Sequence, residues 1–136
     1  MPRKTCYRNL FLVSAAWNLL LAGSALLLQL WQLISAGTAL FPGWQFPIGY
    51  LYFVCVFGFG YYLVAKDINN NHGLVILGIL GKVGVFVIFI ADFFWGAGDI
   101  TQTLIGGVDL LFAFFFIEFL YTYQRHQTRA LMTTAA

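Results

Sequence analysis

Apolar residues fill four long stretches of the chain, and short polar or turn-forming segments separate them. A helix needs about 20 mainly apolar residues to cross ~30 Å of hydrocarbon, and each stretch meets that length. The stretches lack the alternation of apolar and polar positions that the strands of a membrane barrel show. The pattern therefore predicts an all-α protein with four transmembrane helices, at residues 9–34, 47–65, 73–95 and 101–123.

The connections between these helices are short. Residues 35–46 form a neutral segment that contains Pro42, and we expect it to lie as a loop on the membrane surface. Residues 66–72 and 96–100 are rich in turn-forming residues and predict tight connections between neighbouring helices. Because nothing remains for a second domain, we expect residues 1–136 to form a single transmembrane domain, a four-helix bundle.

The composition supports a membrane location. Hydrophobic residues make up 61% of the 136 residues and charged residues only 9%, whereas a soluble domain carries about a quarter charged residues. The mean hydropathy is +0.84. This composition excludes a disordered chain, a disulfide scaffold and a nucleic-acid binder, and the formal net charge of +2 is too small to indicate a polyanionic partner. We expect an integral membrane protein whose first partner is the lipid bilayer.

The positions of the basic residues predict the orientation. All Lys and Arg residues outside the predicted helices fall at one end of the bundle: Arg3, Lys4, Arg8, Lys66, Arg125 and Arg129. The positive-inside rule then places both termini in the cytoplasm, in the cell inner (plasma) membrane. Aromatic residues fall near both expected interfaces, with Trp31, Trp44 and Trp95 on the outer side and Tyr7, Tyr121 and Tyr123 on the inner side.

Ionisable residues inside the predicted helices are the strongest site candidates, because a charge in hydrocarbon needs a partner or a role. Lys82 lies roughly 13 Å from the cytoplasmic end of its helix, and Asp109 lies roughly 12 Å from the outer end of the next. Both are near the midplane of adjacent helices, which predicts a Lys82–Asp109 ion pair, and Asn18 of the first helix falls at the same depth. A structural staple and a role in ligand or proton handling both remain open for this cluster.

Small and polar side chains share one face of each predicted helix, and that face should turn towards the bundle interior. These faces are Ser14, Asn18, Ala22, Ala25, Gln29 and Gln32; Cys55, Gly58, Tyr61, Tyr62 and Ala65; Gly78, Gly81, Lys82, Val85, Phe89 and Asp92; and Gln102, Gly106, Asp109, Ala113, Phe116 and Tyr123. Gln29, Tyr61 and Tyr62 are secondary site candidates, although packing and interhelical hydrogen bonds explain such residues equally well.

Two further acidic residues are secondary candidates. Asp92 lies near the outer interface, where solvation is sufficient to explain it. Glu118 lies near the cytoplasmic end of its helix, about 180° around the helix from Asp109. We expect Glu118 to pair with Lys66 or Arg8, or to contact another subunit.

The sequence predicts no catalytic residue and no metal site. His72 and His126 lie at the cytoplasmic edge rather than at facing positions inside the bundle, and no Cys/His spacing suits zinc or an iron–sulfur cluster. A buried His–acid cluster of the sterol-isomerase type is equally missing from the pattern. Cys6 and Cys55 lie at different depths and should not form a disulfide. No cofactor is predicted, and a quinone or a lipid stays open as a guest.

Residues 57–67 read Phe-Gly-Phe-Gly-Tyr-Tyr-Leu-Val-Ala-Lys-Asp, and Gly73-Leu74-Val75 and residues 78–82 follow them. With these segments the chain resembles small four-helix bacterial membrane proteins, and among them the broad DoxX-like class. The resemblance covers nearly the whole chain in layout and implies a four-helix membrane fold. Because the class includes a membrane subunit of a thiosulfate:quinone oxidoreductase, the resemblance also implies quinone-linked accessory work, but it transfers no catalytic residue.

The leading hypothesis is a non-enzymatic accessory subunit, or a binder of a lipid-like or quinone-like molecule, with Lys82, Asp109 and Asn18 at its polar centre. The 15 Phe residues suit such a guest and equally suit lipid contact. One alternative is a small proton-coupled transporter that works as an oligomer, with Glu118 or Asp109 as its titrating group. Another is the membrane subunit of a quinone-linked oxidoreductase. We expect a homo-oligomer or a subunit of a larger membrane complex.

Overall fold

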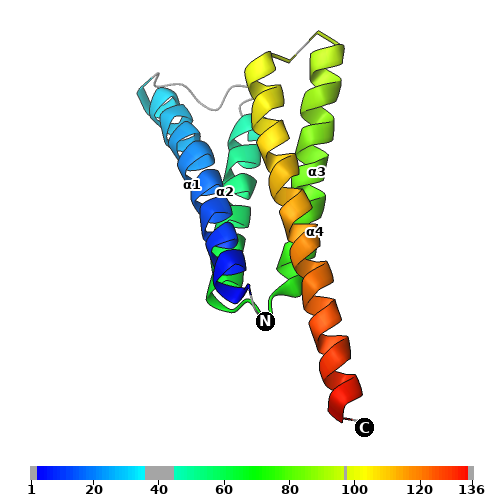
Figure 1. The fold of residues 1–136 in the computed structure, drawn as a ribbon. Coiled ribbons are helices and arrows are strands. Elements are labelled where there is room, and N and C mark those ends of the chain that lie inside the picture. The colour runs from blue at the N-terminus through cyan, green and yellow to red at the C-terminus, as the bar shows by residue number, and fades with distance from the viewer. Residues whose placement is uncertain (1–2, 36–44, 97, 135–136) are drawn as a thin grey trace. The chain divides into compact units, whose positions relative to one another are not determined.

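The computed structural model describes the backbone of residues 3–35, 45–96 and 98–134, and the side chains of residues 3–35, 47–96 and 98–126. These residues form four α-helices with no strand among them (Figure 1). The helices are α1 Lys4–Ser35, α2 Gln45–Lys66, α3 His72–Phe94 and α4 Ile100–Thr134. The prediction of an all-helical chain with four long helices is confirmed.

Each helix contains a segment that is long and apolar enough to cross a membrane. By length and composition these segments are Lys4–Ser35, Pro47–Lys66, His72–Phe94 and Ile100–His126. Three helices are longer than predicted. α1 begins at Lys4 rather than at residue 9, and α4 continues to Thr134 rather than ending at residue 123. α2 is extended less, because it spans Gln45–Lys66 rather than residues 47–65. Hydropathy marks only the apolar part of a helix, whereas backbone hydrogen bonding continues through polar residues at its ends.

The predicted turns at residues 66–72 and 96–100 are present, since α3 begins at His72 and α4 at Ile100. Most of the predicted loop at residues 35–46 lies outside the described residues, and so does Trp44.

The chain divides into two compact units. The α3–α4 unit comprises Met1–Tyr7 and Asn69–Ala136, and the α1–α2 unit comprises Arg8–Ile68. The single transmembrane domain expected from the sequence stays a prediction.

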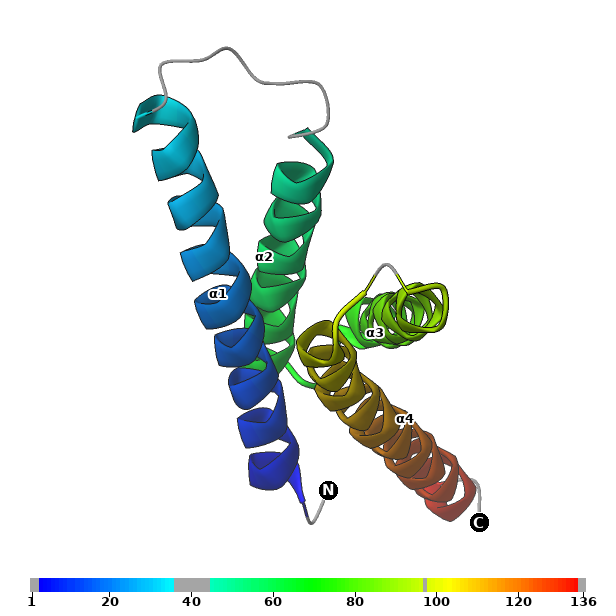
Figure 2. The ribbon, with the colours of Figure 1, turned by 90° about the horizontal axis from the view of Figure 1, so that it is seen from above.

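In the α1–α2 unit, the two helices lie side by side and approach closely at one level (Figure 2). Asn18 Nδ2 donates a hydrogen bond to the Val54 carbonyl oxygen at 3.3 Å. Gly58 lies against α1 at the same level: a Cβ added there would be 2.9 Å from Leu19 Cγ and 3.1 Å from Asn18 Cβ. A side chain at Gly58 would therefore separate the helices, which is why small residues favour such contacts between apolar helices.

In the α3–α4 unit, a tight turn joins the two helices. Gly96 has a φ of +73°, a left-handed conformation that glycine adopts without strain. The Gly98 N–H donates to the Asp92 carbonyl oxygen at 3.0 Å. Asp99 then caps α4, because its Oδ1 accepts a hydrogen bond from the Gln102 N–H at 3.0 Å. This hydrogen bond to the charged form holds the pKa of the Asp99 carboxyl below its ordinary value of 3.8.

Beyond the turn, α3 and α4 run side by side in opposite directions (Figure 1, Figure 2). The buried residues of α3 are Val75, Gly78 and Lys82, which share one face. On α4, a Cβ added to Gly106 would be 3.1 Å from Phe89 Cδ2 and 3.4 Å from Phe86 Cα. The helices thus approach each other closely near the level at which the sequence places its strongest site candidates.

Candidate functional site

The Lys82 and Asp109 side chains form an ion pair between α3 and α4. Lys82 Nζ lies 2.5 Å from Asp109 Oδ1. The two side chains are 3% and 13% exposed, respectively. The Phe112 ring covers the ammonium, with its centroid 5.0 Å from Nζ, which is within the range of a cation–π contact. The structure therefore brings together Lys82 and Asp109, the two residues that the sequence places at similar depths in adjacent helices.

Helix geometry explains why these side chains meet. Lys82 follows Gly78 by four residues and shares its buried face on α3. Asp109 follows Gly106 by three residues on α4, so it lies directly beyond the close approach of α4 to Phe86 and Phe89. The absence of a side chain at Gly106 allows α4 to lie near enough to α3 for the carboxylate to reach the ammonium.

The chemistry of this pair favours a structural role. The ammonium donates to the carboxylate and also faces an aromatic ring, so the two charges neutralise each other in apolar surroundings. Separating such partners leaves an uncompensated buried charge, which is costly. The pair thus has the properties of a staple that fixes α3 against α4.

Asn18, expected at the depth of this pair, is 5% exposed and makes its hydrogen bond to Val54 within the α1–α2 unit. Its place in one polar cluster with Lys82 and Asp109 stays a prediction. Gln29, further along the same helix, is half-buried, and its Oε1 forms no hydrogen bond with the described residues.

The tyrosines of α2 and the acidic residue at the end of α3 occupy different surroundings. Tyr61 is buried, whereas Tyr62 is 38% exposed and its ring lies 5.2 Å from Lys66 Nζ. Consecutive helical residues point about 100° apart, which accounts for the difference in exposure between the two tyrosines. The shared inward face that the sequence suggests for both stays a prediction. Asp92 is half-buried in the last turn of α3, and its backbone carbonyl accepts the hydrogen bond that forms the following turn.

Glu118 has partners other than the expected Lys66 and Arg8. Glu118 Oε1 accepts a hydrogen bond from the Tyr7 hydroxyl at 3.2 Å and lies 3.5 Å from Arg3 Nη1. The physical reason is the early start of α1 at Lys4, which puts Arg3 and Tyr7 one helical turn apart, with a hydrogen bond from the Tyr7 N–H to the Arg3 carbonyl oxygen. Both side chains can therefore reach the same carboxylate.

Tyr7, which the sequence places at the inner membrane interface, packs against α4. Its side chain is buried, and its ring packs edge-to-face on Phe119 with centroids 5.2 Å apart. Its hydroxyl oxygen lies 3.3 Å from Thr122 Oγ1. Trp31, Trp95 and Tyr121, in contrast, are exposed, and their location at the membrane interfaces stays a prediction.

A histidine and aromatic cluster lies one turn further along α4. The His72 ring lies 4.0 Å from the Tyr123 ring and is stacked at 5.9 Å on Phe119, centroid to centroid. The Tyr123 hydroxyl donates to the Asn69 carbonyl oxygen at 3.2 Å. Sequence reasoning did not find this cluster, although the spacing of Phe119 and Tyr123 by four residues places both on one face of α4.

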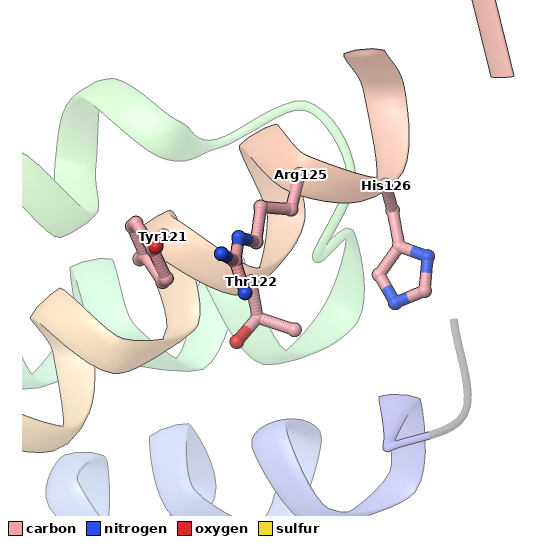
Figure 3. Close-up of a pocket in the computed structure, with 4 residues that line it drawn as sticks. All are labelled: Tyr121, Thr122, Arg125 and His126. Carbon is pink, nitrogen blue, oxygen red and sulfur yellow. The ribbon is translucent and has the colours of Figure 1, made fainter. Parts of the chain in front are cut away.

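A surface pocket of about 200 Å³ lies along the same part of α4 (Figure 3). Its lining residues are Tyr121, Thr122, Arg125 and His126. The Arg125 side chain extends back along the helix, and its guanidinium carbon lies 4.8 Å from the centroid of the Tyr121 ring. The pocket depends on α4 remaining helical beyond residue 123, where the predicted helix ended.

Among the described side chains, no group of three or more His, Cys, Asp or Glu residues could hold a metal ion. Cys6 is an exposed free thiol, and Cys55 is a half-buried one.

Comparison of the chain with protein-family models, with curated proteins and with solved structures finds no match. The resemblance to the DoxX-like class therefore stays a prediction, and the chemistry of the described residues alone carries the functional argument.

Proposed function

We propose that this chain is a non-enzymatic inner-membrane protein that crosses the bilayer four times and binds a lipid-like molecule as an accessory component of a membrane assembly. One observation carries the proposal: Lys82 of α3 and Asp109 and Glu118 of α4 each belong to an ion pair, while large apolar side chains of all four helices are exposed.

The exposed apolar surface supports a lipid environment. Only 17–28% of the most apolar segment of each helix is buried. Leu20, Leu27, Phe53 and Phe114 are among the exposed large side chains. Apolar surface of this extent is unfavourable in water and marks contact with lipid or with another membrane protein.

The pairing of Lys82 with Asp109 supports a role without catalysis. A general base or a nucleophile must be presented to its substrate, whereas this ammonium and this carboxylate are presented to each other. The same pairing argues against Asp109 as the titrating group of a proton-coupled transporter.

The distribution of basic residues supports an orientation with both termini in the cytoplasm. Cys6 provides a direct test, because its thiol is exposed near the start of α1. In a Cys55→Ala variant, a membrane-impermeant maleimide should label Cys6 in inverted membrane vesicles and not in intact cells. Labelling in intact cells would overturn the orientation.

Binding is tested with the full-length protein purified in a mild detergent. Native mass spectrometry should show retained phospholipid or quinone, or a second protein subunit, and the same spectrum gives the number of copies. Protein that carries no lipid, quinone or partner through several detergents would contradict the proposal.

Transport is tested in liposomes that contain the purified protein. We expect no proton flux above that of empty liposomes. A flux that Asp109→Asn or Glu118→Gln abolishes would replace the proposed function with proton-coupled transport.

A further inference from the structure

The pocket on α4 combines a guanidinium, a hydroxyl and an imidazole in a small volume (Figure 3). We propose that it binds the phosphate of an anionic phospholipid whose acyl chain lies along the exposed apolar side of α4. This inference rests on the proposed function, because it requires the membrane location, and it names the class of lipid and the residues that hold it.

The arrangement of Arg125 suits a phosphate. Its guanidinium uses one face for the contact with the Tyr121 ring, and a stacked guanidinium still directs its N–H groups outwards along its edge. Two parallel N–H groups match two phosphate oxygens, which makes arginine well suited to bind this group. Stacking also restricts the side chain before the ligand arrives, so less conformational entropy is lost on binding.

The charges around the pocket favour an anion. Residues 119–126 contain Arg125 and His126 and no acidic residue. The nearest acidic residue along α4 is Glu118, and its carboxylate already has Arg3 and Tyr7 as partners. The positive charge of Arg125 is therefore not cancelled by a carboxylate of its own helix.

The size of the pocket limits what it can take. Its volume of about 200 Å³ is below the range of roughly 300–1,000 Å³ that is typical of sites for drug-sized ligands. The pocket therefore suits a headgroup phosphate rather than a whole quinone ring with its substituents, and the remainder of the ligand must lie outside it.

The exposed side of α4 provides a place for that remainder. Leu110, Phe114, Ile117 and Tyr121 are exposed and lie along one side of the helix, and Arg125 continues their line. From Leu110 to Tyr121 the helix rises by about 16 Å, which matches half of a ~30 Å hydrocarbon core. An acyl chain along this stripe would bring its phosphate to the pocket, at the level where anionic lipids of the cytoplasmic leaflet attract basic residues.

The test compares two single-charge variants of the full-length protein, Arg125→Gln and Arg8→Gln. Arg8 is the matched control, because it is an exposed basic residue expected on the same membrane side but is not part of the pocket. Both variants should have the elution volume and melting temperature of the wild type, since both side chains are exposed. Native mass spectrometry then measures binding of phosphatidylglycerol and of phosphatidylcholine by each protein.

We expect the wild type and Arg8→Gln to bind phosphatidylglycerol at least tenfold more tightly than Arg125→Gln does, with phosphatidylcholine bound weakly by all three. Equal loss in both variants would overturn the site, because it would indicate general attraction to basic residues. Displacement of the lipid by inorganic phosphate at equal concentration would overturn the lipid as the occupant. If Arg125→Gln retains all of its lipid, this inference fails while the proposed lipid binding stands; if the wild type retains none, both fail.

Discussion

α4 carries two carboxylates in its apolar length, and they lie in opposite environments. Asp109 pairs with Lys82 at 2.5 Å, and the side chains are 13% and 3% exposed. Glu118 pairs with Arg3 at 3.5 Å, and the side chains are 39% and 68% exposed. Their separation along α4 turns them about 180° apart, so Asp109 faces α3 whereas Glu118 faces the segment that precedes and begins α1.

This difference shows that burial, more than the presence of a partner, decides how much a charged pair matters to a fold. An exposed ion pair contributes about 0–1 kcal/mol, because water already solvates both groups. A buried pair gains little over apolar residues of the same size, but removing one partner leaves a buried charge at a cost of about 3–5 kcal/mol. Replacing Asp109 alone should therefore destabilise the fold, whereas replacing Glu118 should change the free energy of unfolding little.

The largest effect is expected from breaking the buried pair. Lys82→Met should lower the free energy of unfolding by about 3 kcal/mol or more, because Asp109 loses its counter-charge in an apolar environment. The measurement is unfolding of the purified protein in mixed detergent micelles with increasing dodecyl sulfate.

The control for this prediction is the double variant Lys82→Met with Asp109→Leu. Since it removes both charges and keeps apolar volume, it should recover to within about 1 kcal/mol of the wild type. A double variant as unstable as the single one would contradict the staple and point to another role for the pair.

A smaller effect is expected from separating the helices that carry the buried pair. Gly106→Ala should lower the free energy of unfolding by about 1 kcal/mol, because its Cβ would be 3.1 Å from Phe89 Cδ2 and 3.4 Å from Phe86 Cα. Gly107→Ala is the matched control, since nothing lies within 4 Å of a Cβ at that position. Equal melting temperatures for the two variants would show that α3 and α4 adapt without cost.

The buried pair could be predicted from the sequence, and the exposed one could not. The depths of Lys82 and Asp109 follow from helix rise, and a short turn at residues 96–100 makes their helices neighbours. The partners of Glu118 depend instead on where α1 begins and on how Tyr7 packs against Phe119. Hydropathy predicts neither feature. It does not mark where a helix begins among polar residues, and it does not show which side chains pack against each other.

The pocket on α4 was missed for a related reason. Two of its four lining residues, Arg125 and His126, follow residue 123, where the apolar pattern predicts the helix to end. Once α4 continues, the spacing of four residues between Tyr121 and Arg125 brings the guanidinium over the ring. The apolar pattern predicts the span, and the polar continuation of the helix creates the pocket.

The exposed pair should tolerate changes that the buried pair does not. Glu118→Gln should change the free energy of unfolding by less than about 0.5 kcal/mol, because the amide oxygen can still accept the hydrogen bond from the Tyr7 hydroxyl. The measurement is the same dodecyl sulfate titration, repeated at high salt, where the wild type and the variant should converge further. A loss of unfolding free energy as large as that of Lys82→Met would contradict this prediction, because it would show that Glu118 contributes as much as a buried charge does.

The smallest effect is expected from the charge of a third carboxylate, Asp99, which caps α4 from a fully exposed position. Its hydrogen bond from the Gln102 N–H lowers the folded-state pKa below 3.8, so its contribution is complete well above that pH and is lost as the pH falls through the folded-state pKa. Asp99→Ala should therefore melt below the wild type at about pH 7 and approach it as the pH falls below the folded-state pKa, while Asp99→Asn, which retains a capping oxygen, should stay close to the wild type at neutral pH. A difference between Asp99→Ala and the wild type that does not vary with pH would mean that the side chain acts through something other than its charge. The effect of a carboxylate charge on stability could then not be ranked by burial as far as this exposed cap.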